Sequence, residues 1–232
     1  MKKVYLQLEF MTGKVFEYSK EPQEGYVTFT SKTGKVSYRK YHQGITGELD
    51  SVSIRDTNFG QELSVALKTE DTAMYLNFAL KDQKDFVDSS YAEDLISKLP
   101  NMEKGRTYTI NPFRFIPEGE KYDRTGVSVK QGDLKIEKAF TNSYINKEGV
   151  KVEGDIPAVV WKKDATGKNK PSAASKEARS DMFLEILATQ AERLKWTSSN
   201  TTGYAAAAPA QETKAPAITA AVSTFEEQEL PF

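Results

Sequence analysis

Between residues 62 and 140 the apolar residues of this chain change from strand spacing to helical spacing and back, and this change restricts the fold more than any single motif. Residues 62–68 (ELSVALK) and 74–80 (MYLNFAL) alternate apolar and polar side chains, which is the period of half-buried β-strands. Residues 90–99 instead place apolar side chains at helical spacing ahead of Pro100, and strand character then returns. We therefore expect a sheet whose strands are interrupted by one short helix.

Other stretches with strand character lie on both sides of this region. They are residues 26–30, 35–42, 48–54, 106–110, 126–130 and 133–140. A Lys32-Thr33-Gly34 turn between the first two predicts a hairpin. Ser90 and Glu93 match a capping box at the start of the short helix, and Pro100 is expected to stop it.

The order of these elements indicates a known architecture. Three strands, one short helix and then two or more strands is the order of a five-stranded Greek-key OB barrel, whose helix lies between strands 3 and 4. The strands before residue 48 would be an N-terminal strand extension of this barrel. We expect a mainly β OB-fold domain over residues 1–196. The sequence leaves open whether residues 141–171 form a loop insertion or extra strands.

The end of the chain has two different compositions. Residues 172–196 place Phe183, Leu187 and Leu194 on one face at helical steps, which predicts a C-terminal helix that docks on the barrel. Residues 197–224 are rich in Ala, Pro, Thr and Ser without any period, which is typical of a flexible linker. Residues 225–232 follow as an acidic tip.

Composition argues against most enzyme classes. The chain has no Cys and a single His, His42, so neither a disulfide nor a thiolate or imidazole zinc site is expected. Neither a P-loop nor a Gly-x-Ser-x-Gly elbow occurs, and His42 stands in the polar stretch YRKYHQG, where a surface histidine is expected rather than a catalytic one. We expect a protein without catalytic residues, metal or cofactor.

The sequence also predicts where the protein acts. Gln7 and Glu9 interrupt the first apolar run, and a small-residue cleavage site does not follow it, so a signal peptide is not expected. No window of 18 uncharged apolar residues occurs, so we expect no membrane contact and a cytoplasmic location. The net charge of −1 is unevenly distributed along the chain. Residues from 198 onward contain four glutamates and one lysine, a charge of −3, and residues 1–197, the body, therefore carry +2.

The last eight residues, FEEQELPF, are of the types that dock a chain end on another protein. A terminal aromatic ring fills a small apolar pocket, its α-carboxylate meets a cation, and acids before it pair with a basic rim. The expected partner-binding residues are Glu226, Glu227, Glu229, Leu230, Pro231 and Phe232. Acids, an aliphatic residue, Pro and a terminal Phe behind a low-complexity linker resemble the C-terminal tip of bacterial single-stranded DNA-binding proteins.

In that family an OB barrel binds the DNA and the tip recruits replication, recombination and repair proteins. The resemblance therefore implies that the body of this chain binds DNA and that its tip recruits such proteins. The match covers eight residues, and it departs from the family in two ways. Glu replaces the usual Asp run, with Gln228 inside it, and the barrel pattern begins near Glu48 after an extension that the bacterial family lacks. The chain therefore resembles a divergent, phage-encoded member that would act in the host cytoplasm, and the tetramers of the family are not carried across.

Independent of this resemblance, the body has the residue types that single strands require. Cations along a groove bind the phosphates, and aromatic rings stack on the bases. The candidate contacts to single-stranded DNA are Tyr38, Arg39, Lys40, Tyr41, Arg55, Phe59, Lys68, Tyr75, Phe113, Arg114, Trp161 and Lys162. Strand alternation places Tyr75 opposite the core face, whereas Phe113 would also fit a core position.

The sequence thus predicts a protein that binds and protects single-stranded DNA without sequence preference in replication, recombination and repair. Two alternatives stay open. The modest charge of the body favours an OB-fold adaptor that joins a replication complex without binding DNA, and single-stranded RNA would use the same stacking surface.

Overall fold

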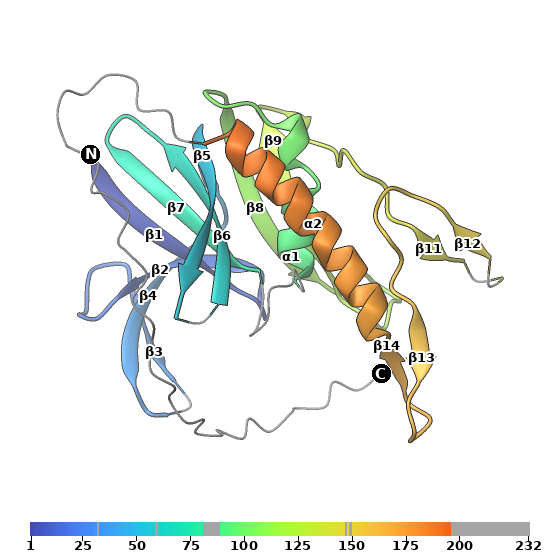
Figure 1. Cartoon of the computed structure of the whole chain (residues 1–232). Coiled ribbons are helices and arrows are strands. Elements are labelled where there is room, and N and C mark those ends of the chain that lie inside the picture. Colours follow the sequence, from blue (N-terminus) through green and yellow to red (C-terminus); the bar gives the residue numbers. More distant parts are fainter. Residues whose placement is uncertain (32, 59, 81–88, 147, 149, 196–232) are drawn as a thin grey trace, which may run out of the picture. The chain divides into compact units, whose positions relative to one another are not determined.

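The computed structural model describes residues 1–195 except 32, 59, 81–88, 147 and 149, and these residues fold as a mainly β unit (Figure 1). Ten strands form one sheet in the order β10-β9-β8-β5-β6-β7-β1-β2-β4-β3. The strands are β1 (Lys2–Glu9), β2 (Lys14–Ser19), β3 (Val27–Thr30), β4 (Val36–His42), β5 (Ile45–Thr57), β6 (Gly60–Lys68), β7 (Thr72–Ala79), β8 (Thr107–Phe115), β9 (Arg124–Gln131) and β10 (Leu134–Lys135). The predicted linker 197–224 and tip 225–232 lie outside the described residues.

The middle of the sheet is an antiparallel meander of β5, β6 and β7. β8 returns to the other side of β5, and β9 continues the sheet beyond β8. The register of β5 shifts between Leu49 and Ser51, where one extra residue bends this long strand. The predicted order of three strands, a helix and two strands is therefore present from β5 to β9.

The N-terminal strands complete the other half of the sheet. β1 pairs with β7 in parallel, from Lys2 opposite Thr72 to Gln7 opposite Asn77. β2 pairs with β1 and β4, and the predicted hairpin of β3 and β4 is confirmed, with Gly34 at a positive φ in its turn. The extension thus belongs to the same sheet as the meander.

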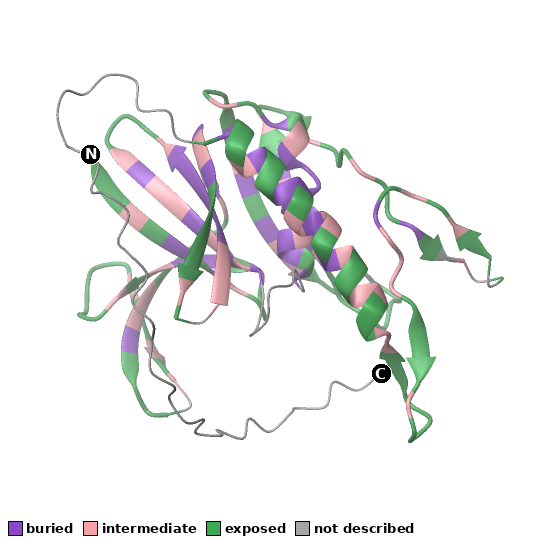
Figure 2. Ribbon diagram, viewed as in Figure 1, coloured by how far each residue is buried: buried purple, intermediate pink, exposed green. Residues whose placement is uncertain are grey.

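Two α-helices of the described residues pack against the part of the sheet that contains β5, β7 and β9. They are α1 (Ser90–Ile96) and α2 (Ala173–Arg193), and a short 3₁₀ helix, η1 (Leu99–Asn101), follows α1. α2 runs across the molecule in front of α1 and β8 (Figure 1), and its buried residues Phe183 and Leu187 face the core, whereas its outer side is exposed (Figure 2). The predicted C-terminal helix and its apolar face are confirmed.

The core follows the predicted alternation in β7, whereas β6 is buried on both faces, because Ser64 and Ala66 are buried as well. Leu63, Val65 and Leu67 of β6 are fully buried, as are Leu76 and Phe78 of β7. Burial of these side chains, at about 1.5 to 3 kcal/mol each, is the main term that holds the meander against the helices.

The helix termini differ from the prediction. Ser89, not Ser90, caps α1 and accepts a hydrogen bond from the Ala92 backbone, because the Glu93 carboxylate is bound by Arg179 and does not fold back on the cap. α1 ends at Ile96 without help from Pro100, which lies inside η1 and starts its single turn.

One strand prediction needs correction, and one open question is answered. Of residues 133–140, only Leu134–Lys135 form a strand, β10, because the segment then leaves the sheet and Ala139 donates to the Ser97 carbonyl beside α1. Residues 141–171 contain extra strands: β11 (Tyr144–Ile145) pairs with β12 (Lys151–Val152), and β13 (Trp161–Lys163) pairs with β14 (Asn169–Pro171).

Candidate nucleic-acid interface

A partly exposed stack of two tyrosine rings lies where the N-terminal strands meet the meander. Tyr5 of β1 and Tyr75 of β7 are register partners in the parallel pair, and the neighbouring partners Leu6 and Leu76 are buried on the other face. The two tyrosine rings stack with centroids 5.1 Å apart and planes 20° apart. Because 51% of Tyr5 remains exposed, the pair presents a flat aromatic surface to solvent.

A cation lies above this pair. Arg55 is part of β5, and its guanidinium carbon is 6.0 Å from the centre of the Tyr5 ring. Its neighbour across the strands is Glu62 of β6. The exposed guanidinium could contact a phosphate while a base stacks on the tyrosines.

A second group of rings lies on the same face of β2 and β4. Gln7 and Tyr5 point to one side of β1, and Gln7 is the register partner of Phe16, which in turn is the partner of Tyr41. The rings of Phe16 and Tyr41 are 5.9 Å apart, and Lys14 lies 5.8 Å from the Tyr41 ring centre. Tyr18, two residues beyond Phe16, is 44% exposed. We call Tyr5, Tyr18, Tyr41 and Tyr75 the aromatic face, and Phe16, which is buried, packs against the Tyr41 ring from within the sheet.

Arg39 holds the aromatic face in place. Its guanidinium lies 3.3 Å from the Phe29 ring centre and 4.3 Å from that of Phe16, and it donates to the Glu9 carboxylate at 2.7 Å. The Tyr41 hydroxyl donates to the same carboxylate oxygen at 3.2 Å. Arg39 is therefore engaged in positioning these rings, whereas the sequence assigned it to the DNA.

Several other predicted contacts lie elsewhere or are already paired. Tyr38 and Lys40 point to the opposite side of β4 from Tyr41, and Lys40 is 3.6 Å from Glu17. Lys68 lies on the same side of the sheet as Tyr75, where it forms an ion pair with Asp50. These pairs reduce the positive charge that the surface offers to phosphates.

The end of β8 carries a further predicted pair. Strand alternation puts Phe113 and Phe115 on one side of β8, where Phe113 is partly exposed and Phe115 is 52% exposed, and their rings are 5.8 Å apart. Arg114 points to the other side, pairs with Asp123 and donates to the Phe10 carbonyl at 3.2 Å. The aromatic residues remain available to a ligand, whereas Arg114 ties β8 to the β1–β2 turn.

The remaining predictions fall in three places. Trp161 and Lys162 lie on β13, which belongs to a separate two-stranded sheet and not to the ten-stranded one. Phe59 lies outside the described residues, as do the partner-binding residues Glu226 to Phe232.

Sequence reasoning missed two members of the aromatic face, Tyr5 and Tyr18, and also the buried ring of Phe16 that packs against Tyr41. A signal for the first was present, because KVYLQLE alternates and so places Tyr5 opposite Leu6 and Leu8. Its partner could not be identified, because the parallel pairing of β1 with β7 joins segments about 70 residues apart.

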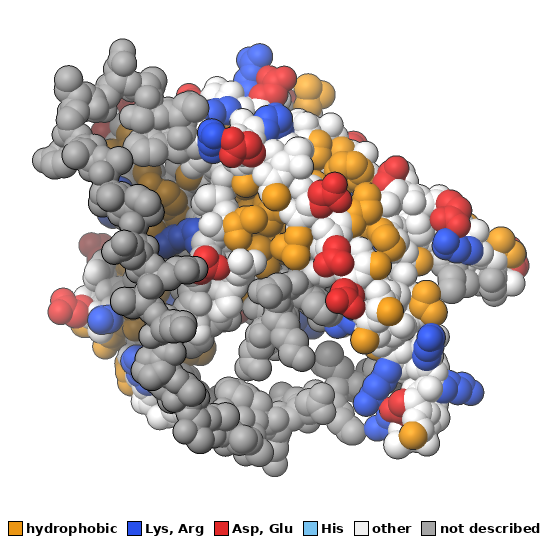
Figure 3. Space-filling model, in the orientation of Figure 1, with side chains coloured by type: hydrophobic (Ala, Val, Ile, Leu, Met, Phe, Trp, Pro, Cys, Tyr) orange, Lys and Arg blue, Asp and Glu red, His pale blue; other side chains and the backbone are white. Residues whose placement is uncertain are grey.

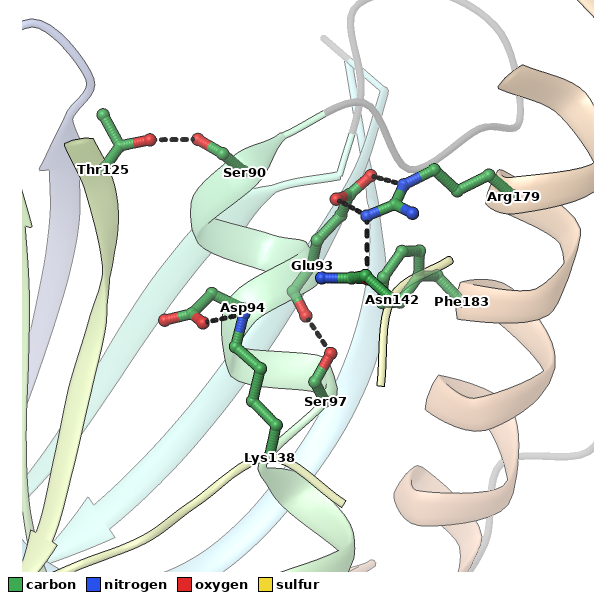
Figure 4. A pocket seen from close by; sticks show the side chains of 9 residues that line it. All are labelled: Ser90, Glu93, Asp94, Ser97, Thr125, Lys138, Asn142, Arg179 and Phe183. Carbon is green, nitrogen blue, oxygen red and sulfur yellow. Dashed lines mark hydrogen bonds and ion pairs between the residues drawn. The ribbon is translucent and has the colours of Figure 1, made fainter. Parts of the chain in front are cut away.

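A polar cavity of about 140 Å³ lies between α1, α2 and β9 (Figure 4). Arg179 donates two hydrogen bonds to Glu93, at 3.1 and 2.8 Å, and further ones to Asn142 and to the Pro157 carbonyl. Asp94 accepts from Lys138 at 2.7 Å and from Lys98 at 2.8 Å. The charges lining the cavity are thus paired with one another, which is typical of a structural network.

Asp94 is the centre of this network. Burial raises the pKa of its carboxyl, but the hydrogen bonds from Lys138, Lys98 and the Val127 backbone outweigh burial and hold the pKa below its usual value. The Lys98 ammonium is almost completely buried and also donates to the Val127 carbonyl. Asp94 therefore compensates a buried cation that connects α1 to β9.

The helices among the described residues are too short or too polar to cross a membrane. The described parts of the chain contain no cluster of three or more His, Asp or Glu side chains placed to hold a metal ion. Comparison with protein-family models, curated proteins and solved structures found no match for this chain.

Proposed function

We propose that this protein binds single-stranded DNA without sequence preference, with the bases stacked along the aromatic face. The observation that carries the proposal is the exposed Tyr5–Tyr75 stack with Arg55 above it. Stacking on rings tolerates every base, since each base has a π-face, and a neighbouring cation binds the phosphate. The second ring group, around Tyr41, would extend the path of the strand across β2 and β4.

The topology supports the proposal. We infer that β5, β6, β7, α1, β8 and β9 form an OB-type unit, in which β8 returns beside β5 as the fourth strand of the Greek key does. β1 would then take the place next to β7. OB folds bind oligonucleotides on the face of their second and third strands, which here are β6 and β7, and Tyr75 lies on β7.

One observation favours the adaptor alternative. Four of the predicted cations, Arg39, Lys40, Lys68 and Arg114, have an acidic partner within the sheet region. A protein-binding adaptor would use the aromatic rings of this face as an apolar contact surface. It would not need unpaired cations there. The two functions differ in their response to an oligonucleotide, so a binding experiment separates them.

The test is the fluorescence anisotropy of labelled oligo-dT titrated with the full-length chain, beside duplex DNA and single-stranded RNA of equal length. Tyr75→Ala and Tyr5→Ala should each weaken oligo-dT binding by about 1 to 3 kcal/mol, a loss of roughly five- to 150-fold. Tyr144→Ala, an exposed ring on the separate β11, is the matched control and should bind as wild type does.

The outcome decides between the functions. Equal affinity of wild type, Tyr5→Ala and Tyr75→Ala would refute the aromatic face as the binding surface. Absence of binding to any strand would favour the adaptor, and tighter binding to RNA than to DNA would change the substrate class. Loss of thermal stability with unchanged affinity would mean that the two rings serve the fold.

A further inference from the structure

The hairpin of β13 and β14 is the most basic segment of the described chain that does not belong to the main sheet. Residues 161–170 contain four lysines and one aspartate, a net charge of +3. Every residue of both strands is exposed except Pro171, which is partly exposed. Lys and Arg side chains gather at this hairpin at the lower right of Figure 3. We call residues 161–171 the basic arm.

The arm has a defined structure although it buries little. Asp164 closes its turn by accepting hydrogen bonds from the Thr166 hydroxyl at 2.6 Å, the Thr166 backbone at 2.8 Å and the Lys168 backbone at 3.1 Å. These hydrogen bonds, above all the one from the Thr166 hydroxyl, lower the pKa of Asp164 to about 2. Gly167 has a φ of 80°, as this turn requires.

The base of the arm is fixed to α2. Ser172, the residue before the helix, donates to the Val160 carbonyl at 2.7 Å, and the Val160 backbone donates to the Ser175 hydroxyl at 3.0 Å. An isolated two-stranded hairpin is marginal in water, so these hydrogen bonds and the turn are needed to keep it formed. The arm therefore holds its side chains at fixed positions away from the core.

Two features of the arm lower its own stability. Lys162 and Lys170 are direct register partners on one face, and like charges opposite each other repel. Asp164 lies 3.4 Å from Lys170 and offsets part of this repulsion. Trp161 is 55% exposed, although Trp is usually buried for most of its surface. An anion between the two lysines and a flat ligand on the indole would relieve both costs.

We propose that the basic arm is a second binding site for single-stranded nucleic acid, where Lys162 and Lys170 bind a backbone phosphate on one face of the hairpin. Trp161, which strand alternation puts on the opposite face, stacks on a base of the same strand as it passes around the arm. This inference rests on the proposed function and adds a binding site outside the aromatic face. A binding site for a plain anion would explain the lysines but not the exposed indole, whereas a strand supplies both a phosphate and a base.

The first experiment uses Trp161 as a reporter. The chain has two tryptophans, so Trp196→Phe leaves Trp161 as the single indole emitter in the full-length protein. Titration with oligo-dT should quench its emission in step with the anisotropy of the labelled strand. Inorganic polyphosphate, which has no bases, should compete for the lysines without this quenching, and equal quenching by polyphosphate would overturn the assignment of Trp161.

The second experiment measures how much Lys162 and Lys170 contribute to phosphate binding. In the double variant Lys162→Gln/Lys170→Gln, the slope of log K against log salt for oligo-dT should become shallower by about 0.7 for each phosphate that the arm no longer neutralises. The control Lys135→Gln/Lys151→Gln removes the same charge from exposed lysines of β10 and β12 and should keep the wild-type slope.

The results separate this inference from the proposed function. Binding of oligo-dT with unquenched Trp161 and an unchanged slope in the arm variant would overturn the basic arm as a site and leave the aromatic face standing. Failure of the wild-type chain to bind any single strand would overturn both.

Discussion

Replacement of Asp94 by Asn should destabilise the protein far more than the loss of an ordinary surface charge. The change keeps the shape of the side chain but removes the negative charge that lies 2.8 Å from Lys98 and 2.7 Å from Lys138. Lys138 is 41% exposed and can turn to solvent, whereas the side chain of Lys98 is only 6% exposed. The variant therefore leaves one buried cation without its partner, which costs about 3 to 5 kcal/mol.

The effect can be measured by urea unfolding followed by circular dichroism at pH 7. A loss of this size corresponds to a fall in Tm of roughly 6 to 20 °C for a domain of this length. The double variant Asp94→Asn/Lys98→Met removes both charges and should recover much of the stability. Glu120→Gln, which breaks the exposed pair with Arg124, is the control and should cost at most about 1 kcal/mol.

The pH dependence follows from the lowered pKa of Asp94. Its contribution should be fully present above the unfolded pKa, which is near 3.8, and should disappear as the pH falls through the lower folded pKa. A loss below about 1 kcal/mol in the single variant, or a double variant no more stable than the single one, would contradict the buried-cation argument.

Three further predictions concern the N-terminal turn and the C-terminal tip. Gly13→Ala should cost more than about 1 kcal/mol in thermal unfolding, because Gly13 has a φ of 68° and an added Cβ would lie 2.7 Å from the Phe113 carbonyl carbon and the Arg114 nitrogen. Gly25→Ala, with a φ of 79° and no neighbour within 4 Å, should cost less, and an equal cost for both would show that β8 does not constrain the turn. Deletion of residues 225–232 should leave the unfolding transition unchanged and keep or raise oligo-dT affinity at low salt, since it removes three glutamates that compete with phosphate. Phe232→Ala should lose most of the proteins recovered by the intact chain in a pull-down, because one aromatic anchor dominates a small interface, and equal recovery would refute the docking role.

The sequence predicted the local features of the fold and missed those that depend on distant pairing. Alternation placed Tyr75 opposite the core, and helical spacing placed Phe183 and Leu187 in it, because both patterns are read within one element. The prediction of the capping serine was wrong by one residue. It required Glu93 to fold back on the cap, but the Glu93 carboxylate is bound by Arg179, 86 residues away. Arg39 stood beside two tyrosines and was assigned to DNA, whereas Glu9, Phe16 and Phe29 hold it.

The candidate site shows the same limit. The sequence identified single aromatic residues beside cations, but the aromatic face is assembled from strands whose neighbours are fixed by the parallel pairing of β1 and β7. Which cations are paired also depends on register, as Lys68 with Asp50 and Lys40 with Glu17 illustrate. Register can be predicted for a hairpin with a short turn and not for strands joined across most of a domain.

The parallel pairing of β1 with β7 also sets an order for assembly during synthesis. β1 and β2 emerge first and can pair with each other, but β1 has no second neighbour until residues 72–77 have been made. Non-local pairings of this kind slow folding, because the intervening loop must be closed before the two strands can pair. Until β1 docks, β7 is an open edge that carries Leu76 and Phe78, and such edges recruit strands from other chains. We therefore expect truncations that remove β1 to aggregate on expression, even though they leave every residue of the β5–β9 unit in place.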